Sequence, residues 1–240
     1  MAATDYYERY WSESGAQYTG HTTPSYERLL ASLVTPDSSC LDVGCGDGLR
    51  SGVWLNQHAG TYVGVDISSR AVEAARNKLN IDARVISDAT SLPFEDETFD
   101  LIVCIEVLEH LFEPQLAATE MRRVLRPGGI LVVQVPNVVH WWHRAVFALK
   151  GRFVPFGDAL DEPWRDPHIR FFTFASLQAM LRQQGFQPTR IEGEGGNLLL
   201  DTPKLRRLAR NEAPGAVSRR LTARYPALFA KRARVVATKS

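Results

Sequence analysis

The chain has 240 residues, 45% of them hydrophobic, and its 28 Lys and Arg residues nearly balance its 27 Asp and Glu residues. This length and composition suit one large domain, and the charge balance argues against nucleic-acid binding through overall charge. Three cysteines without a regular spacing indicate neither a disulfide framework nor a zinc site. The sequence shows no signal peptide and no apolar run of about 20 residues, so we expect a cytoplasmic protein without a transmembrane segment.

Short apolar runs alternate with amphipathic segments along the first half of the chain. Strands are predicted at residues 39–43, 61–66, 83–87, 99–105 and 129–135, because these runs are rich in Val and Ile and apolar on both faces. Helical spacing predicts helices at 50–59, 68–80 and 115–126, with Ser68 or Ser69 capping the second helix and the RPGG segment ending the third. This alternation predicts an α/β fold with a doubly wound sheet and helices on both faces.

The pattern changes after residue 137. Residues 138–172, which are rich in Trp, His, Arg and Pro, are interpreted as a lid or acceptor-binding insertion. A helix at 173–185 and a strand at 188–193 are followed by a basic helical insertion at 199–230 and a last strand at 233–239. We interpret residues 1–240 as one domain with an N-terminal helical cap at 1–37. The basic region suits a solvated helix face, and contact with phosphate or a membrane surface stays open.

The segment CLDVGCGDG, residues 40–48, places a glycine-rich loop directly after a strand. A dinucleotide-binding loop would need a third glycine where Leu49 stands, and a nucleotide-hydrolase loop would need a lysine. Asp42 precedes the loop instead, and a carboxylate there favours a positively charged ligand over a phosphate.

Two more acids follow the next two strands. Asp66 ends the strand at 61–66, where it can bind the hydroxyl groups of a ribose, and Asp88 follows the strand at 83–87, where it can bind an adenine amino group. A ligand with a nucleoside and a positive charge but no phosphate matches S-adenosylmethionine.

Four segments resemble the successive motifs of class I S-adenosylmethionine-dependent methyltransferases: LDVGCGDG, VGVDIS, SDATSLPFEDETFDLIVCIEVLEHL and LRPGGILVVQVPN. The resemblance covers residues 38–137 and, more loosely, 168–193. It implies a Rossmann-like sheet of seven strands, mostly parallel with an antiparallel last strand. It also implies a cofactor site made of Asp42 near the methionine part, Asp66 at the ribose, Asp88 and Ala89 beside the adenine, and Gly44, Cys45, Gly46, Ile67 and Ile105 around them.

Transfer to a hydroxyl group is helped by a base, for which histidine is suited near neutral pH. Of six histidines, His110 follows the strand at 99–105, and His168 precedes the helix at 173–185. We predict these two as base candidates, and a structural role for each stays open.

The segment EVLEH adds the question of a metal ion. Its residues Glu106, Glu109 and His110 resemble a pattern in ubiquinone-biosynthesis O-methyltransferases, where the resemblance implies a divalent metal. Related sequences carry the same pattern without a metal, so both interpretations stay open.

The acceptor is predicted to be a small molecule or a glycan with a reactive hydroxyl, because the aromatic residues of 138–170 suit a ring, a sugar face or an apolar chain. One alternative is a non-catalytic or weakly catalytic accessory subunit, since the segment VPNVVHWWHRAVFALKGRF also resembles the methionine-biosynthesis protein W family. A nucleic-acid methyltransferase is disfavoured, because IEVL stands where such enzymes carry an N/D-P-P-Y/F tetrapeptide.

Overall fold

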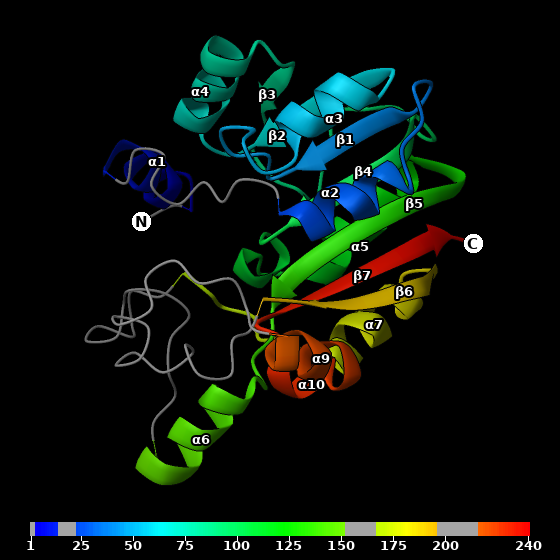
Figure 1. The fold of residues 1–240 in the computed structure, drawn as a ribbon. Coiled ribbons are helices and arrows are strands. Elements are labelled where there is room, and N and C mark those ends of the chain that lie inside the picture. Colours follow the sequence, from blue (N-terminus) through cyan, green and yellow to red (C-terminus); the bar gives the residue numbers. More distant parts are fainter. Residues whose placement is uncertain (1–2, 14–22, 152–166, 196–215) are drawn as a thin grey trace.

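A computed structural model of the chain describes residues 3–13, 23–151, 167–195 and 216–240. Parts of the cap at 1–37, the insertion at 138–172 and the basic insertion at 199–230 lie outside these residues. Within them, seven strands form one sheet in the order β3-β2-β1-β4-β5-β7-β6 (Figure 1). The strands are β1 (Ser39–Val43), β2 (Thr61–Asp66), β3 (Ala83–Val85), β4 (Phe99–Ile105), β5 (Leu125–Pro136), β6 (Phe186–Glu194) and β7 (Arg232–Lys239).

Strand direction confirms the fold class. Strands β1 to β5 pair in parallel, and β7 runs antiparallel to both of its neighbours, β5 and β6. The carboxyl ends of β1, β2, β3, β4 and β5 therefore share one edge of the sheet, which we call the carboxyl edge. This is where open α/β sheets bind their ligands, and it brings together the loops that the sequence singled out.

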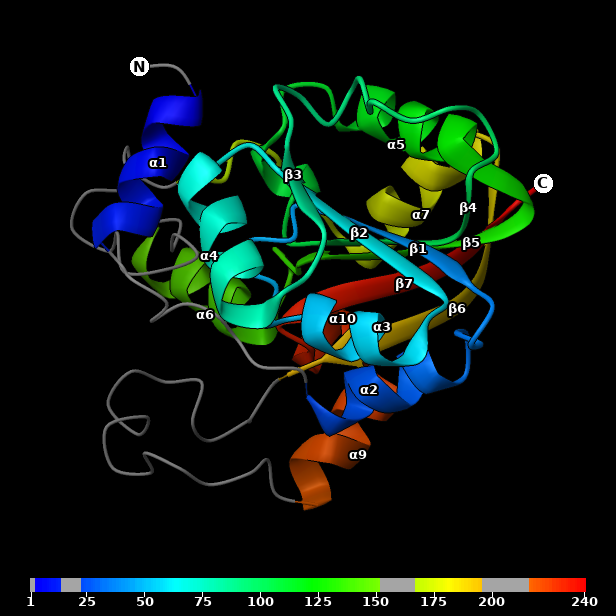
Figure 2. The ribbon, with the colours of Figure 1, turned by 90° about the horizontal axis from the view of Figure 1, so that it is seen from above.

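The helices form a layer on each face of the sheet (Figures 1 and 2). One layer contains α2 (Pro24–Ala31), α3 (Gly52–His58) and α4 (Ser69–Leu79), and the other contains α5 (Pro114–Val124) and α7 (Phe174–Gln183). Side chains alternate between the two layers along each strand, as Cys40 and Leu41 do in β1. Both faces are therefore apolar, which explains the near-continuous hydrophobic runs in the sequence.

The described residues contain four further helices and one short 3₁₀ turn. They are α1 (Ala3–Glu13), α6 (Trp141–Lys150), α9 (Ala216–Arg224) and α10 (Pro226–Phe229), and the 3₁₀ turn η1 spans Leu108–His110. Figures 1 and 2 show α1 beside α4. None of the helices in the described part of the chain combines the length and apolar character needed to cross a bilayer.

Two predicted helix starts are confirmed by their caps. The Ser68 hydroxyl accepts a hydrogen bond from the amide of Ala71 at 3.3 Å, and the Thr173 hydroxyl accepts one from the amide of Ser176 at 3.0 Å. The prediction for RPGG was wrong in part, because α5 already ends at Val124 and RPGG belongs to β5. Leu125 pairs with Phe99 and Ile130 pairs with Leu101, so RPGG forms an irregularity within β5, where Gly128 has a φ of +76°.

Candidate cofactor and acceptor site

The glycine loop leaves β1 and leads into α3. The amides of Gly44 and Cys45 both donate to the carbonyl of Val65 at the end of β2, at 2.8 and 3.0 Å. The loop glycines at 44, 46 and 48 all have positive φ angles, between +56° and +79°. A Cβ atom on Gly44 would lie 2.2 Å from Cγ2 of Val107, so the loop and the segment after β4 can approach this closely only with glycine at that position.

Asp66 ties the glycine loop to the start of α4. Its Oδ2 accepts from the amide of Gly46 and its Oδ1 from the amide of Ser68, both at 2.9 Å. Burial of this carboxyl raises its pKa, and the hydrogen bonds oppose that rise. Ile67 lies in the turn between β2 and α4. The carboxylate predicted to bind ribose is thus held by the loop predicted to bind the rest of the cofactor.

Asp42 is buried beneath the loop, with only 3% of its surface exposed. The Tyr62 hydroxyl donates to its Oδ2 at 3.4 Å. Burial raises the pKa of Asp42 to about 7, although the charge of Arg50 opposes the shift. A cationic ligand nearby would favour the ionised form, so the chemistry of this site fits a sulfonium or ammonium group.

The remaining predicted cofactor residues lie along the same edge. Asp88 is exposed and its Oδ1 accepts from the amide of Thr90 at 2.8 Å, whereas Ala89 is buried. Ile105 is buried at the end of β4. Cys45 is buried as well, and burial raises the pKa of its thiol well above the usual value, which does not suit a nucleophile.

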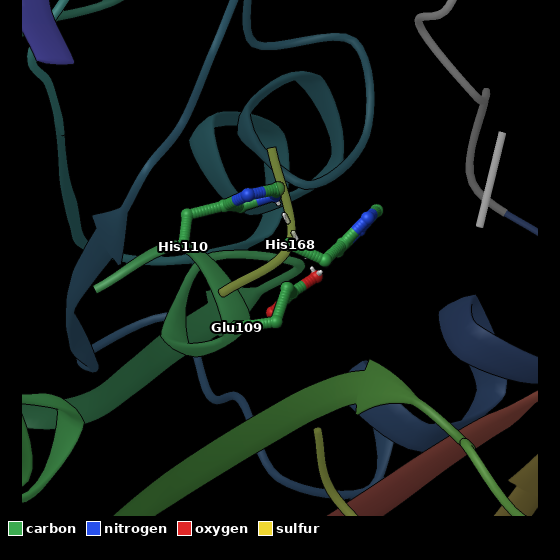
Figure 3. A group of neighbouring side chains, drawn as sticks. All are labelled: Glu109, His110 and His168. Atoms are coloured by element: carbon green, nitrogen blue, oxygen red, sulfur yellow. Dashed lines mark ion pairs between the residues drawn. The ribbon is translucent and has the colours of Figure 1, made fainter. Parts of the chain in front are cut away.

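The two predicted base candidates, His110 and His168, lie side by side although they are far apart in the sequence (Figure 3). The imidazole rings of His110 and His168 stack with centroids 4.7 Å apart. The Nε2 atoms of His110 and His168 lie 3.8 and 4.0 Å from Oε1 of Glu109. Nδ1 of His110 lies 3.1 Å from the carbonyl of Pro167, an arrangement that assigns the proton to Nδ1 and leaves Nε2 as the basic nitrogen.

Backbone hydrogen bonds explain how the segment around His168 reaches this place. The amides of Ile169 and Arg170 both donate to the carbonyl of Glu109, at 2.9 and 3.0 Å. Nothing in the local sequence indicates this long-range contact, so the group of Glu109 with two histidines could not be predicted from spacing.

Glu109 is the buried acid of this group, with 1% of its side chain exposed. No hydrogen-bond donor in the described residues reaches either of its side-chain oxygens. Burial, together with the nearby charge of Glu106, raises its pKa well above the usual value.

The residues that can share a metal ion differ from those implied by the sequence resemblance. One ligand atom from each of Glu109, His110 and His168 lies within 4.8 Å of the others. Glu106 instead accepts from Nε2 of Gln134 at 3.3 Å and lies 3.4 Å from Nε of Arg232. The donor set of two imidazoles and one carboxylate fits a divalent transition metal better than Mg²⁺.

Comparison with known proteins finds similarity to methyltransferases. Residues 41–133 match the family model described as "Methyltransferase domain". The chain is 38% identical over 119 residues to methyltransferase GfsG of Streptomyces halstedii, covering 47% of the chain and 41% of the relative. It is 32% identical over 131 residues to 27-O-demethylrifamycin SV methyltransferase of Amycolatopsis mediterranei, covering 52% and 48%. The matches thus span less than half the length of these two curated relatives.

A solved structure is similar over a larger share of the chain. The S-adenosylmethionine-dependent methyltransferase of Methanosarcina mazei superposes with a TM-score of 0.60 at 18% identity, covering 92% of this chain and 99% of that protein. At this identity the likeness concerns the fold. Residues 41–133 therefore match a methyltransferase domain, and the described residues have the fold of class I S-adenosylmethionine-dependent methyltransferases.

Proposed function

We propose that the protein transfers a methyl group from S-adenosylmethionine to a hydroxyl group of a small molecule or glycan. The observation that carries this proposal is the group formed by Glu109, His110 and His168 at the carboxyl edge, next to the predicted cofactor loop. Two imidazoles beside a buried carboxyl group suit the removal of a proton from a hydroxyl. Methyl transfer to a thioether or to an already ionised group would not need such a base. The name of the rifamycin-related protein, which refers to an O-demethylated compound, agrees with this acceptor class.

S-adenosylmethionine, when bound, supplies an activated methyl carbon. Transfer would form a bond from the acceptor oxygen to this carbon and break the carbon–sulfur bond, which would release S-adenosylhomocysteine. In this proposal Nε2 of His110 or His168 accepts the hydroxyl proton. Glu109 lies within about 4 Å of both nitrogens. Protonation of either imidazole would favour the ionised form of Glu109, which in turn would stabilise the imidazolium. The buried loop and strand ends orient the reactants, and positioning supplies a large share of the rate.

The test is a screen of acceptors with the purified chain, followed by mass spectrometry of the products and measurement of S-adenosylhomocysteine release. The panel contains phenols, aliphatic alcohols and monosaccharides, with amines and carbon acids as competing classes. Methylation of oxygen is expected. Products methylated only at nitrogen or carbon would contradict the proposal.

Histidine variants then test the base. His110→Gln or His168→Gln is expected to lower the turnover number by about 10²-fold or more, while S-adenosylmethionine still binds. His58→Gln is the matched control, because His58 is an exposed histidine on α3 that stacks on Trp54. If neither His110→Gln nor His168→Gln lowers turnover, neither imidazole is the base.

The same residues would hold a divalent metal, if the enzyme uses one. A metal there would act as a Lewis acid that lowers the pKa of the acceptor hydroxyl. Removal of metal with EDTA and addition of Mg²⁺, Mn²⁺ or Zn²⁺ separates the two cases. Unchanged turnover after EDTA treatment supports the metal-free base, whereas recovery with one metal supports a metal site on Glu109.

Cofactor binding without turnover on any acceptor would favour the accessory-subunit alternative. That alternative then predicts a stable complex with an acyltransferase.

A further inference from the structure

The face of α1 that meets the domain contacts the glycine loop, His110 and the start of α4. Trp11 packs against the glycine loop so closely that a Cβ atom on Gly46 would lie 2.9 Å from Cζ2 of the indole. Tyr7, one helical turn earlier, meets the ring of His110 edge-on with centroids 5.8 Å apart. Glu8 reaches the start of α4, beside Asp66. Positions 7 and 11 share one side of a helix, so both rings face the carboxyl edge.

Tyr7 is held between the ribose end and the acceptor end of the site. The carboxyl groups of Glu109 and Asp66 both lie near its hydroxyl. Tyr6 packs edge-on against Tyr7 at 5.1 Å, and Tyr10 packs edge-on against Trp11 at 5.7 Å, which fixes the directions of both rings.

The cofactor site predicted from the sequence has the methionine part near Asp42 and the glycine loop, so the sulfonium of a bound cofactor would lie there. We propose that Tyr7 and Trp11 form an aromatic wall on the open side of this place and bind the sulfonium by cation–π attraction. The carboxylates of Asp42 and Asp66 attract the positive charge from the side of the strands. The negatively polarised faces of the two rings attract it from the side of α1 and add no further anion. The inference rests on the cofactor lying on the glycine loop and does not depend on the acceptor.

Glu8 keeps the wall in position. Its Oε1 accepts from the amide of Ser69 at 2.6 Å, and its Oε2 accepts from the Ser68 hydroxyl at 3.3 Å and from the amide of Arg70 at 3.4 Å. An acid at a helix N-terminus satisfies amides that lack partners within the helix. Because α4 starts directly after Asp66, α1 is fixed to the same turn that holds the predicted ribose-binding carboxylate.

The test compares two ligands that differ by one methyl group and one positive charge. Calorimetric titration gives the affinities for S-adenosylmethionine and S-adenosylhomocysteine in the wild-type chain and in Trp11→Leu, Tyr7→Leu and Tyr7→Phe. We expect the leucine variants to lower the ratio of the two affinities about 5- to 30-fold, the effect of losing about 1–2 kcal/mol of cation–π attraction. Tyr7→Phe keeps the ring, so its ratio should match that of the wild type.

Tyr225→Leu is the control, because Tyr225 is an exposed aromatic residue beside α10. Circular dichroism confirms that each variant is folded, and Trp11→Phe replaces Trp11→Leu if the latter fails to fold, with a smaller fall in the ratio expected. An equal loss of affinity for both ligands would overturn the aromatic wall and leave α1 a purely structural role. An unchanged ratio in both leucine variants would overturn it as well. A wild-type chain that binds neither ligand would instead remove the cofactor assignment itself.

Discussion

Replacement of Asp42 by asparagine should change how the stability of the protein depends on pH. The pKa of Asp42 is about 7 in the fold instead of 3.8. Between these two values the folded state binds a proton that the unfolded chain has lost, so the free energy of unfolding falls as pH rises. A shift of about three pKa units corresponds to about 4 kcal/mol. An asparagine side chain does not titrate in this range, so the variant should lack this part of the decline.

Urea denaturation of both proteins between about pH 4 and about pH 8 measures the effect. The stability of Asp42→Asn relative to the wild type should increase by about 4 kcal/mol over this range. Asp37→Asn, which changes an exposed acid, should show no such trend. Parallel pH curves for Asp42→Asn and the wild type would refute the argument that burial dominates at this carboxyl. Calorimetry in buffers of different ionisation enthalpy offers a second check, because a bound cation should make Asp42 release its proton.

Three further substitutions test other parts of the site. Gly44→Ala should lower the free energy of unfolding by about 3 kcal/mol, because the new methyl group clashes with Val107 and the backbone has a positive φ. Gly128→Ala is the control: Gly128 has a φ of +76° but nothing lies within 4 Å, so the free energy of unfolding should fall by only about 1 kcal/mol. Urea denaturation of both variants measures the difference. Asp66→Ala should abolish measurable S-adenosylmethionine binding, and unchanged affinity in calorimetry would exclude the ribose role of Asp66. The same variant should destabilise the fold, because it removes the hydrogen bonds that Asp66 accepts from Gly46 and Ser68. Glu8→Gln should weaken the docking of α1 by about 0.5–1 kcal/mol, which amide hydrogen exchange would show as faster exchange in α1 but not in α7. Hydrogen bonds to the ionised carboxylate lower the pKa of Glu8, so the exchange rate of α1 in the wild type should rise to that of the variant only as pH falls through this pKa.

The central strands could be predicted from sequence because their residues have one environment whichever way they point. In β4 and β1 both faces are covered by helices, so burial imposes an apolar run that is visible without knowledge of the partners. The start of β5 could not be found in this way. Residues 126–129 carry turn-forming types, and they belong to β5 because Leu125 before them pairs with Phe99 of β4 and Ile130 after them pairs with Leu101.

In the candidate site, too, some residues could be placed from local sequence and others could not. Asp42 lies in β1, Gly44 follows that strand and Asp66 ends β2. Because β1 and β2 are neighbours, local motifs were enough to expect these residues together. His168 lies near Glu109 because the amides of Ile169 and Arg170 bond to the carbonyl of Glu109, and the sequence does not record this long-range pairing. The approach of Trp11 to Gly46 likewise depends on tertiary packing, and no spacing in the sequence records it.

The place of β7 between β5 and β6 has a consequence for synthesis of the protein on the ribosome. Strand β5 ends at Pro136 and its partner begins only at Arg232, so one edge of β5 stays unpaired while the intervening residues are made. At about 5–20 residues per second this interval lasts about 5–20 seconds. During that time the nascent chain exposes a long apolar strand edge, which is the kind of surface that chaperones shield.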